Sequence, residues 1–100
     1  MLDVKKLLTK LLKRTNFRIV TNTSSAFTIS ANNTTWVQVS VPSGQGRPIA
    51  VVGYYIINGW YLNVYNLSLV GTTRADVALY NPSTSATGTI TVTVYFLMVD

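Results

Sequence analysis

The sequence predicts a mainly β domain, an antiparallel β-sandwich of jelly-roll or immunoglobulin-like type, that follows a short N-terminal amphipathic helix. Three observations lead to this fold class. Short apolar runs with alternating residues recur after residue 16, polar turn segments separate these runs, and no helical pattern lies between them. We therefore divide the chain into a helix over residues 1–15 and a β-sandwich domain over residues 16–100.

The helix is predicted from the spacing of leucines and lysines in the first fifteen residues. In a heptad pattern the apolar residues share a wide stripe, and the lysines lie on the other side. A helix of this length is marginal in water on its own, so its stripe needs a partner. We expect an oligomerisation helix that uses Val4, Leu7, Leu8, Leu11 and Leu12. The alternative is that the helix folds back on its own domain, which would give a monomeric α+β protein.

About seven strands are expected in the rest of the chain. Each is a run of β-branched or aromatic residues, or of alternating apolar residues, bounded by turn-forming residues. The expected strands are residues 17–22, 26–31, 35–41, two arms within 48–71, 74–80 and 89–99.

The strongest local signal lies in residues 48–71. Its two apolar arms flank Asn58-Gly59, a pair suited to a type I′ turn, in which both central residues need positive φ. We predict a central β-hairpin there. Its first arm is apolar on both faces, unlike a strand of a sheet with one face in water.

Residues 49–57 and 95–99 are both apolar on two faces. A single sandwich buries one face of each sheet, so the second face needs another partner. Closed symmetric association would cover it, and we expect a homotrimer with its helices bundled at one end. The expected interface residues of the β domain are Tyr54, Ile56, Tyr95 and Leu97.

The composition argues against an enzyme. The chain has no cysteine and no histidine, and Asp3, Asp76 and Asp100 are its only acidic residues. Thiol catalysis, the usual general base, Cys-ligated zinc and a pair of catalytic carboxylates are therefore excluded. Gly44-Gln45-Gly46 precedes a strand and does not form a phosphate loop. We expect no catalytic residues, no metal and no cofactor.

The net charge of +5 belongs mostly to the helix, because its first fourteen residues contribute +4. The β domain has no basic face that would indicate nucleic-acid binding. The basic helix resembles a membrane-surface peptide, but it has no Trp or Phe at a boundary position, and we expect no membrane contact. No apolar run reaches the roughly 18 residues of a membrane span, and the N-terminus does not match a signal peptide.

Exposed aromatic residues are the candidate ligand-binding groups. Rings of Trp and Tyr can stack on the CH faces of sugars, and Asn side chains can supply hydrogen bonds. Trp60, Tyr61, Tyr65 and Tyr54 could form such a platform, with Asn58, Asn63 and Asn66 beside it, and Trp36 next to Gln38 is a separate candidate. The candidate residues are Trp36, Arg47, Trp60 and Tyr61. The alternative is that these aromatic side chains fill the core and the subunit interface.

The opening MLDVKKLLTKLLKR, the stretch RPIAVVGYYIINGW and the closing strand TGTITVTVYFLMVD resemble small tail-fibre or baseplate-type proteins. These proteins come from phages and prophages of Gram-positive gut bacteria. The resemblance covers most of the chain and implies a virion protein, made in the bacterial cytoplasm, whose trimeric heads bind host cell-surface carbohydrate. The fibre shaft is missing, and no family binding residue can be carried over. The alternative is a monomeric bacterial carbohydrate-binding or adhesion domain.

Overall fold

The computed structural model describes residues 16–100 together with Val4 and Lys6. Apart from Val4, which is exposed, and Lys6, the helix predicted over residues 1–15 lies outside the described residues, and so do Leu7, Leu8, Leu11 and Leu12 of its interface stripe. Within the described part of the chain, no helix has the length and hydropathy needed to cross a bilayer.

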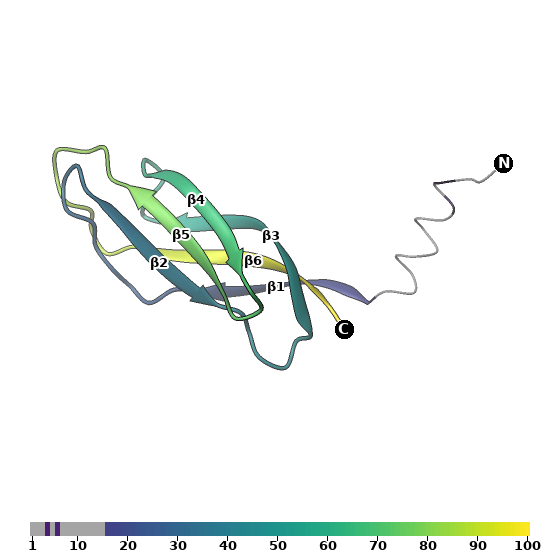
Figure 1. Cartoon of the computed structure of the whole chain (residues 1–100). Coiled ribbons are helices and arrows are strands. Elements are labelled where there is room, and N and C mark those ends of the chain that lie inside the picture. The colour runs from purple at the N-terminus through teal and green to yellow at the C-terminus, as the bar shows by residue number, and fades with distance from the viewer. Residues whose placement is uncertain (1–3, 5, 7–15) are drawn as a thin grey trace.

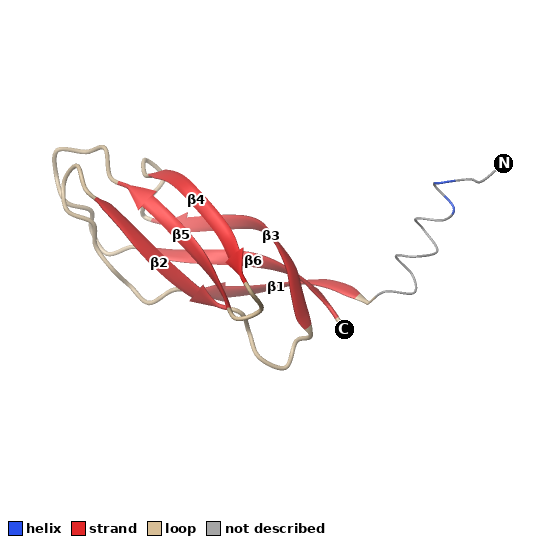
Figure 2. Cartoon of the chain, in the orientation of Figure 1, coloured by secondary structure: helices blue, strands red, loops and turns tan. Residues whose placement is uncertain are grey.

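The described domain consists of six strands in two antiparallel three-stranded sheets. The strands are β1 (Phe17–Thr23), β2 (Thr34–Ser40), β3 (Arg47–Ile57), β4 (Asn63–Val70), β5 (Arg74–Tyr80) and β6 (Thr91–Val99). Their order is β1-β6-β3 in one sheet and β2-β5-β4 in the other, and the sheets form two layers (Figure 1). Loops join the strands over residues 16–100 (Figure 2). The prediction of a mainly β fold is confirmed, whereas the predicted count of seven strands is wrong.

The two central strands, β6 and β5, supply most of the core. Ile90, just before β6, and every second residue of β6 from Val92 to Met98 are fully buried, as the alternation in the sequence predicts. The matching residues of β5 are Ala75, Val77 and Leu79, which join the same cluster. The two sheets therefore share one hydrophobic core, and each sheet turns its other face outward.

The predicted strand over residues 26–31 does not form. Phe27 makes an isolated bridge with Ile90, and Ile29 is buried as the alternation predicts. However, the Ile29 amide donates to Thr87 Oγ1 at 2.8 Å, and its carbonyl accepts from the Thr87 amide at 2.9 Å and from Asn81 Nδ2 at 3.2 Å. Because the loop after β5 already satisfies this backbone, no ladder of strand hydrogen bonds is built.

The predicted hairpin around Asn58-Gly59 is wrong. β3 pairs with β6 and β4 pairs with β5, so the two arms lie in different sheets. Asn58 has the positive φ of 63° that a type I′ turn requires, but Gly59 does not have a positive φ. The Leu62 amide instead donates to the Gly59 carbonyl at 3.0 Å, and the Leu62 side chain is buried. Residues 58–62 therefore carry the chain from one sheet to the other.

Two irregularities change the faces of β3. The register against β6 shifts between Pro48 and Ala50 and again between Val51 and Gly53. An extra residue in a strand reverses the alternation beyond it. The two reversals cancel beyond Gly53, so only Ala50 and Val51 lie on exchanged sides, and Tyr54 and Ile56 lie opposite Val94 and Val92, on the same core side as Pro48.

Candidate functional site

The outer face of the β1-β6-β3 sheet is apolar. Its side chains lie in register across the three strands, and we call them the apolar outer face: Phe17, Ile19, Tyr55, Ile57, Tyr95 and Leu97. All are exposed except Leu97, which is half-buried. Large apolar groups gathered on one sheet face are typical of an interaction surface.

The structure divides the four predicted interface residues of the β domain between two faces. Tyr95 and Leu97 belong to the apolar outer face. Ile56 packs against the core cluster, and Tyr54, at the edge of the same inner face, remains 46% exposed. Phe17 and Ile19 also belong to the apolar outer face but were not predicted as interface residues. Their spacing of two residues in the expected strand 17–22 indicates that they share one face.

The outer face of the β2-β5-β4 sheet is mostly polar and carries one aromatic pair. Trp36 of β2 and Asn66 of β4 lie on either side of Ala78 of β5. Tyr65 sits at a register shift in β4, and its ring meets that of Trp36 at 83° with the centroids 6.1 Å apart. Ala78 points away from the core yet is fully buried, because its large neighbours cover it. We call Trp36 and Tyr65 the aromatic corner.

Polar groups follow in the next row of this face. Gln38 and Ser68 lie on either side of Asp76. Asn66 Nδ2 donates to Ser68 Oγ at 3.0 Å and to the Asp76 carbonyl at 3.3 Å, which fixes the amide beside the aromatic corner. Arg74 Nε donates to Asp76 Oδ1 at 2.9 Å, so the two charges on this face form a pair.

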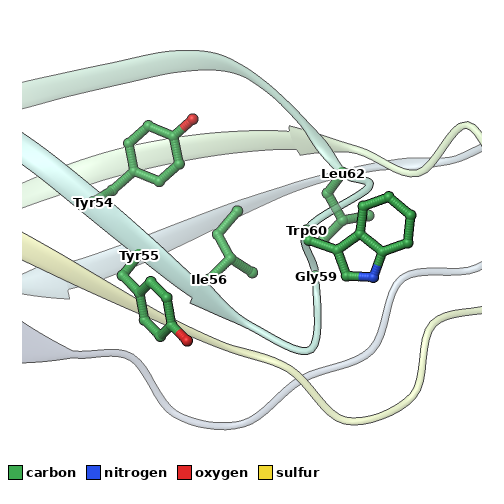
Figure 3. Close-up of a pocket in the computed structure, with 6 residues that line it drawn as sticks. All are labelled: Tyr54, Tyr55, Ile56, Gly59, Trp60 and Leu62. Carbon is green, nitrogen blue, oxygen red and sulfur yellow. The ribbon is translucent and has the colours of Figure 1, made fainter.

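A shallow hollow of about 230 Å³ lies where the chain leaves β3. Its lining residues are Tyr54, Tyr55, Ile56, Gly59, Trp60 and Leu62 (Figure 3). The two tyrosines point to opposite sides of β3, and Trp60 lies beyond Ile56 (Figure 3). Trp60 is 90% exposed, and its ring meets that of Tyr61 edge-on. No charged side chain lines this hollow.

The four predicted ligand-binding residues do not meet in one place. Trp36 lies on the polar sheet face, Trp60 and Tyr61 lie at the crossing between the sheets, and Arg47 opens β3 opposite Val99. Tyr65, which we expected beside Trp60, pairs with Trp36 instead. Tyr65 therefore does not join the platform expected around Trp60 and lies instead against Trp36, which was predicted as a separate candidate.

Within residues 16–100, together with Val4 and Lys6, no group of three acidic, His or Cys side chains could hold a metal ion. No protein-family model, no curated protein and no solved structure matches the chain.

Proposed function

We propose that this chain is a non-enzymatic, self-associating head module of tail-fibre type from a phage or prophage virion, and that it binds host-surface carbohydrate. In the proposed assembly three copies associate through the apolar outer face, and their N-terminal helices bundle. The proposed fold class is a β-sandwich of jelly-roll or immunoglobulin-like type. The apolar outer face is the observation that carries this proposal.

The contrast between the two outer faces supports association through one of them. Five of the six side chains of the apolar outer face are exposed, whereas the opposite outer face is mostly polar. Removing apolar surface from water yields roughly 25 cal/mol for each Å² buried. A second and a third copy of the chain gain this free energy by covering the face, and closed symmetry lets every copy gain it equally.

The position of β1 also supports the trimer. The predicted helix leads into β1 at Phe17 with one residue between them, and Phe17 and Ile19 both belong to the apolar outer face. A bundle of three helices would therefore bring the start of β1 from each copy toward the common axis. The helix stripe and the apolar outer face then serve one interface.

The second candidate function is a monomeric bacterial carbohydrate-binding or adhesion domain. The aromatic corner favours it, because exposed rings beside polar side chains can bind a sugar without association. Carbohydrate recognition is thus common to both candidates, and the oligomeric state separates them.

Light scattering on the full chain over a wide range of concentrations tests the proposal. We expect a mass of three chains, and we expect deletion of residues 1–15 to raise the concentration at which the trimer forms. A mass of one chain at every concentration would leave the monomeric candidate. A glycan array probed with the same preparation tests carbohydrate recognition separately.

A further inference from the structure

The aromatic corner has the geometry to receive a ring. Trp36 is 59% exposed and Tyr65 is 52% exposed, so their mutual contact leaves about half of each side chain open to solvent. Two rings that meet at 83° form two walls, and a flat ligand can lie against one wall while its edge touches the other. The π face of an aromatic ring is electronegative, and the CH groups of a pyranose carry partial positive charge.

The corner is also rigidly built. Trp36 is in the middle of β2, which is paired with β5 along its whole length, and Asn66 is held by two hydrogen bonds. Trp60, the other exposed tryptophan, lies in the connection between the sheets. Binding groups on strands are positioned better than those on loops, so the corner is the better candidate for a specific site.

The neighbouring polar groups suit hydroxyl donors and carry no net charge. Asp76 Oδ2 and Asn66 Oδ1 can each accept a hydrogen bond, and Gln38 offers an amide beside them. The pairing of Arg74 with Asp76 cancels the two charges on this face. An anionic sugar would find no free cation here, and a quaternary ammonium ion would find no free carboxylate.

Self-association would not cover this face, because the aromatic corner and the apolar outer face lie on opposite sides of the domain. We propose that the aromatic corner, with Gln38, Asn66 and Asp76, is a binding site for a neutral pyranose ring. This inference rests on the carbohydrate recognition in the proposed function and gives that recognition a place and a ligand class.

The test uses the full chain with Trp60→Phe, which leaves Trp36 as the single tryptophan. Cellobiose, lactose and chitobiose are titrated while Trp36 fluorescence and its indole N–H resonance are recorded. Sorbitol has the hydroxyl groups without the ring and serves as the control ligand, and glucuronate and tetramethylammonium represent charged ligands. We expect saturable changes with at least one disaccharide and none with the other three compounds.

Variants then separate binding from folding, and calorimetric titration measures their affinities because Trp36→Ala removes the fluorescent reporter. Trp36→Ala should weaken disaccharide binding about ten-fold or more, which corresponds to roughly 1.4 kcal/mol. Trp36→Phe keeps a ring and should retain part of the affinity, and Gln38→Ala should weaken binding without changing the denaturation midpoint. Trp60→Ala should leave binding unchanged. These results together would support the site.

Three outcomes would contradict the proposed pyranose site. If an arrayed glycan binds the wild-type chain but Trp36→Ala binds equally well, the site is wrong while the proposed recognition function stands. Binding of tetramethylammonium or glucuronate in place of the disaccharides would show that the ligand class is wrong. If no glycan binds the wild-type chain, carbohydrate recognition and this site are both refuted.

Discussion

Ile19 of β1 lies directly opposite Leu97 of β6 on the outer face of their sheet, and Ala50 of β3 lies opposite Leu97 on the other side. The next residue along β1, Val20, lies opposite Phe96 and packs against the core. Two consecutive residues of one strand therefore face two different environments. Substitutions at the two positions should separate association from folding.

Ile19→Thr should weaken self-association while leaving the stability of the single chain within about 0.5 kcal/mol, because the side chain is exposed and threonine keeps the β-branch. Val20→Thr should destabilise the fold by about 1 kcal/mol, since it places a hydroxyl against the core. Light scattering measures the first effect, and urea denaturation at a concentration where the chain is monomeric measures the second. An unchanged mass for Ile19→Thr at all concentrations would count against the apolar outer face as the interface.

The loop before β3 contains two glycines with positive φ that differ in their surroundings. Gly46 has a φ of 95°, and a Cβ placed there would lie 2.6 Å from the Val99 carbonyl oxygen. Gly44 has a φ of 73° and open space around it. Gly46→Ala should therefore cost about 3 kcal/mol or more, since it adds a clash with backbone to the conformational strain, whereas Gly44→Ala should cost about 1 kcal/mol. Denaturation midpoints that shift equally in the two variants would refute the close approach of this loop to β6.

Asn81 should be the most sensitive polar residue of the domain. It is fully buried, its Nδ2 donates to the carbonyls of Ile29, Ser30 and Ser85, and its Oδ1 accepts from the Ser83 amide at 3.0 Å. Asn81→Ala removes these four hydrogen bonds from a buried site, although the Ile29 carbonyl keeps the Thr87 amide as a donor, and we expect a loss of about 2 to 4 kcal/mol.

The matched control is Asn33→Ala. Asn33 is exposed, and its Nδ2 donates only to the Ala31 carbonyl among the hydrogen bonds of the described residues. We expect this variant to lose less than about 1 kcal/mol. Thermal unfolding gives the two stabilities, and amide hydrogen exchange in residues 26–33 shows whether Asn81 holds that segment. Equal effects at the two positions would mean that the buried hydrogen bonds contribute little.

The sequence predicts the buried faces well wherever a strand is regular. The alternation from Ile90 to Met98 and from Ala75 to Leu79 identifies the core side of both central strands, because one buried face imposes a period of two residues. The Arg74–Asp76 pair also follows from this alternation, and the structure contains it. The mainly β character of the domain follows from the same local pattern.

Which strands pair with each other, and where a strand has a register shift, are harder to predict from the sequence. Whether the arms beside Asn58 pair with each other depends on β5 and β6, which come later in the chain and have fully buried inner faces. The two register shifts in β3 exchange the sides of Ala50 and Val51, and nothing in the local alternation marks them. Tyr65 joins Trp36 through another such shift, so the aromatic corner was visible only as two separate aromatic residues.

The last prediction concerns Asp100, which ties the end of β6 to the start of β1. Its Oδ2 accepts from Asn16 Nδ2 at 2.7 Å, and its Oδ1 lies 2.8 Å from Arg18 Nη2. The hydrogen bond from Asn16 and then that from Arg18 hold the pKa of the Asp100 carboxyl below its ordinary value. A group whose pKa is lowered by folding stabilises the native state above its unfolded pKa, and this stabilisation is lost as the pH falls through the folded pKa.

We therefore expect the wild-type chain to be more stable than Asp100→Asn at neutral pH. The difference should be small, because the carboxyl is exposed and solvent screens its interaction with Arg18. The difference should shrink in acid and vanish below the lowered pKa of Asp100. Urea denaturation of both chains at a series of pH values measures it, and NMR titration of the Asp100 carboxyl gives the pKa directly. Asn16→Ala removes the first of the two hydrogen bonds, so in that background the pKa should rise and the difference should vanish at a higher pH. A stability difference that stays constant across the series would mean that the charge of Asp100 does not help to join these two strands.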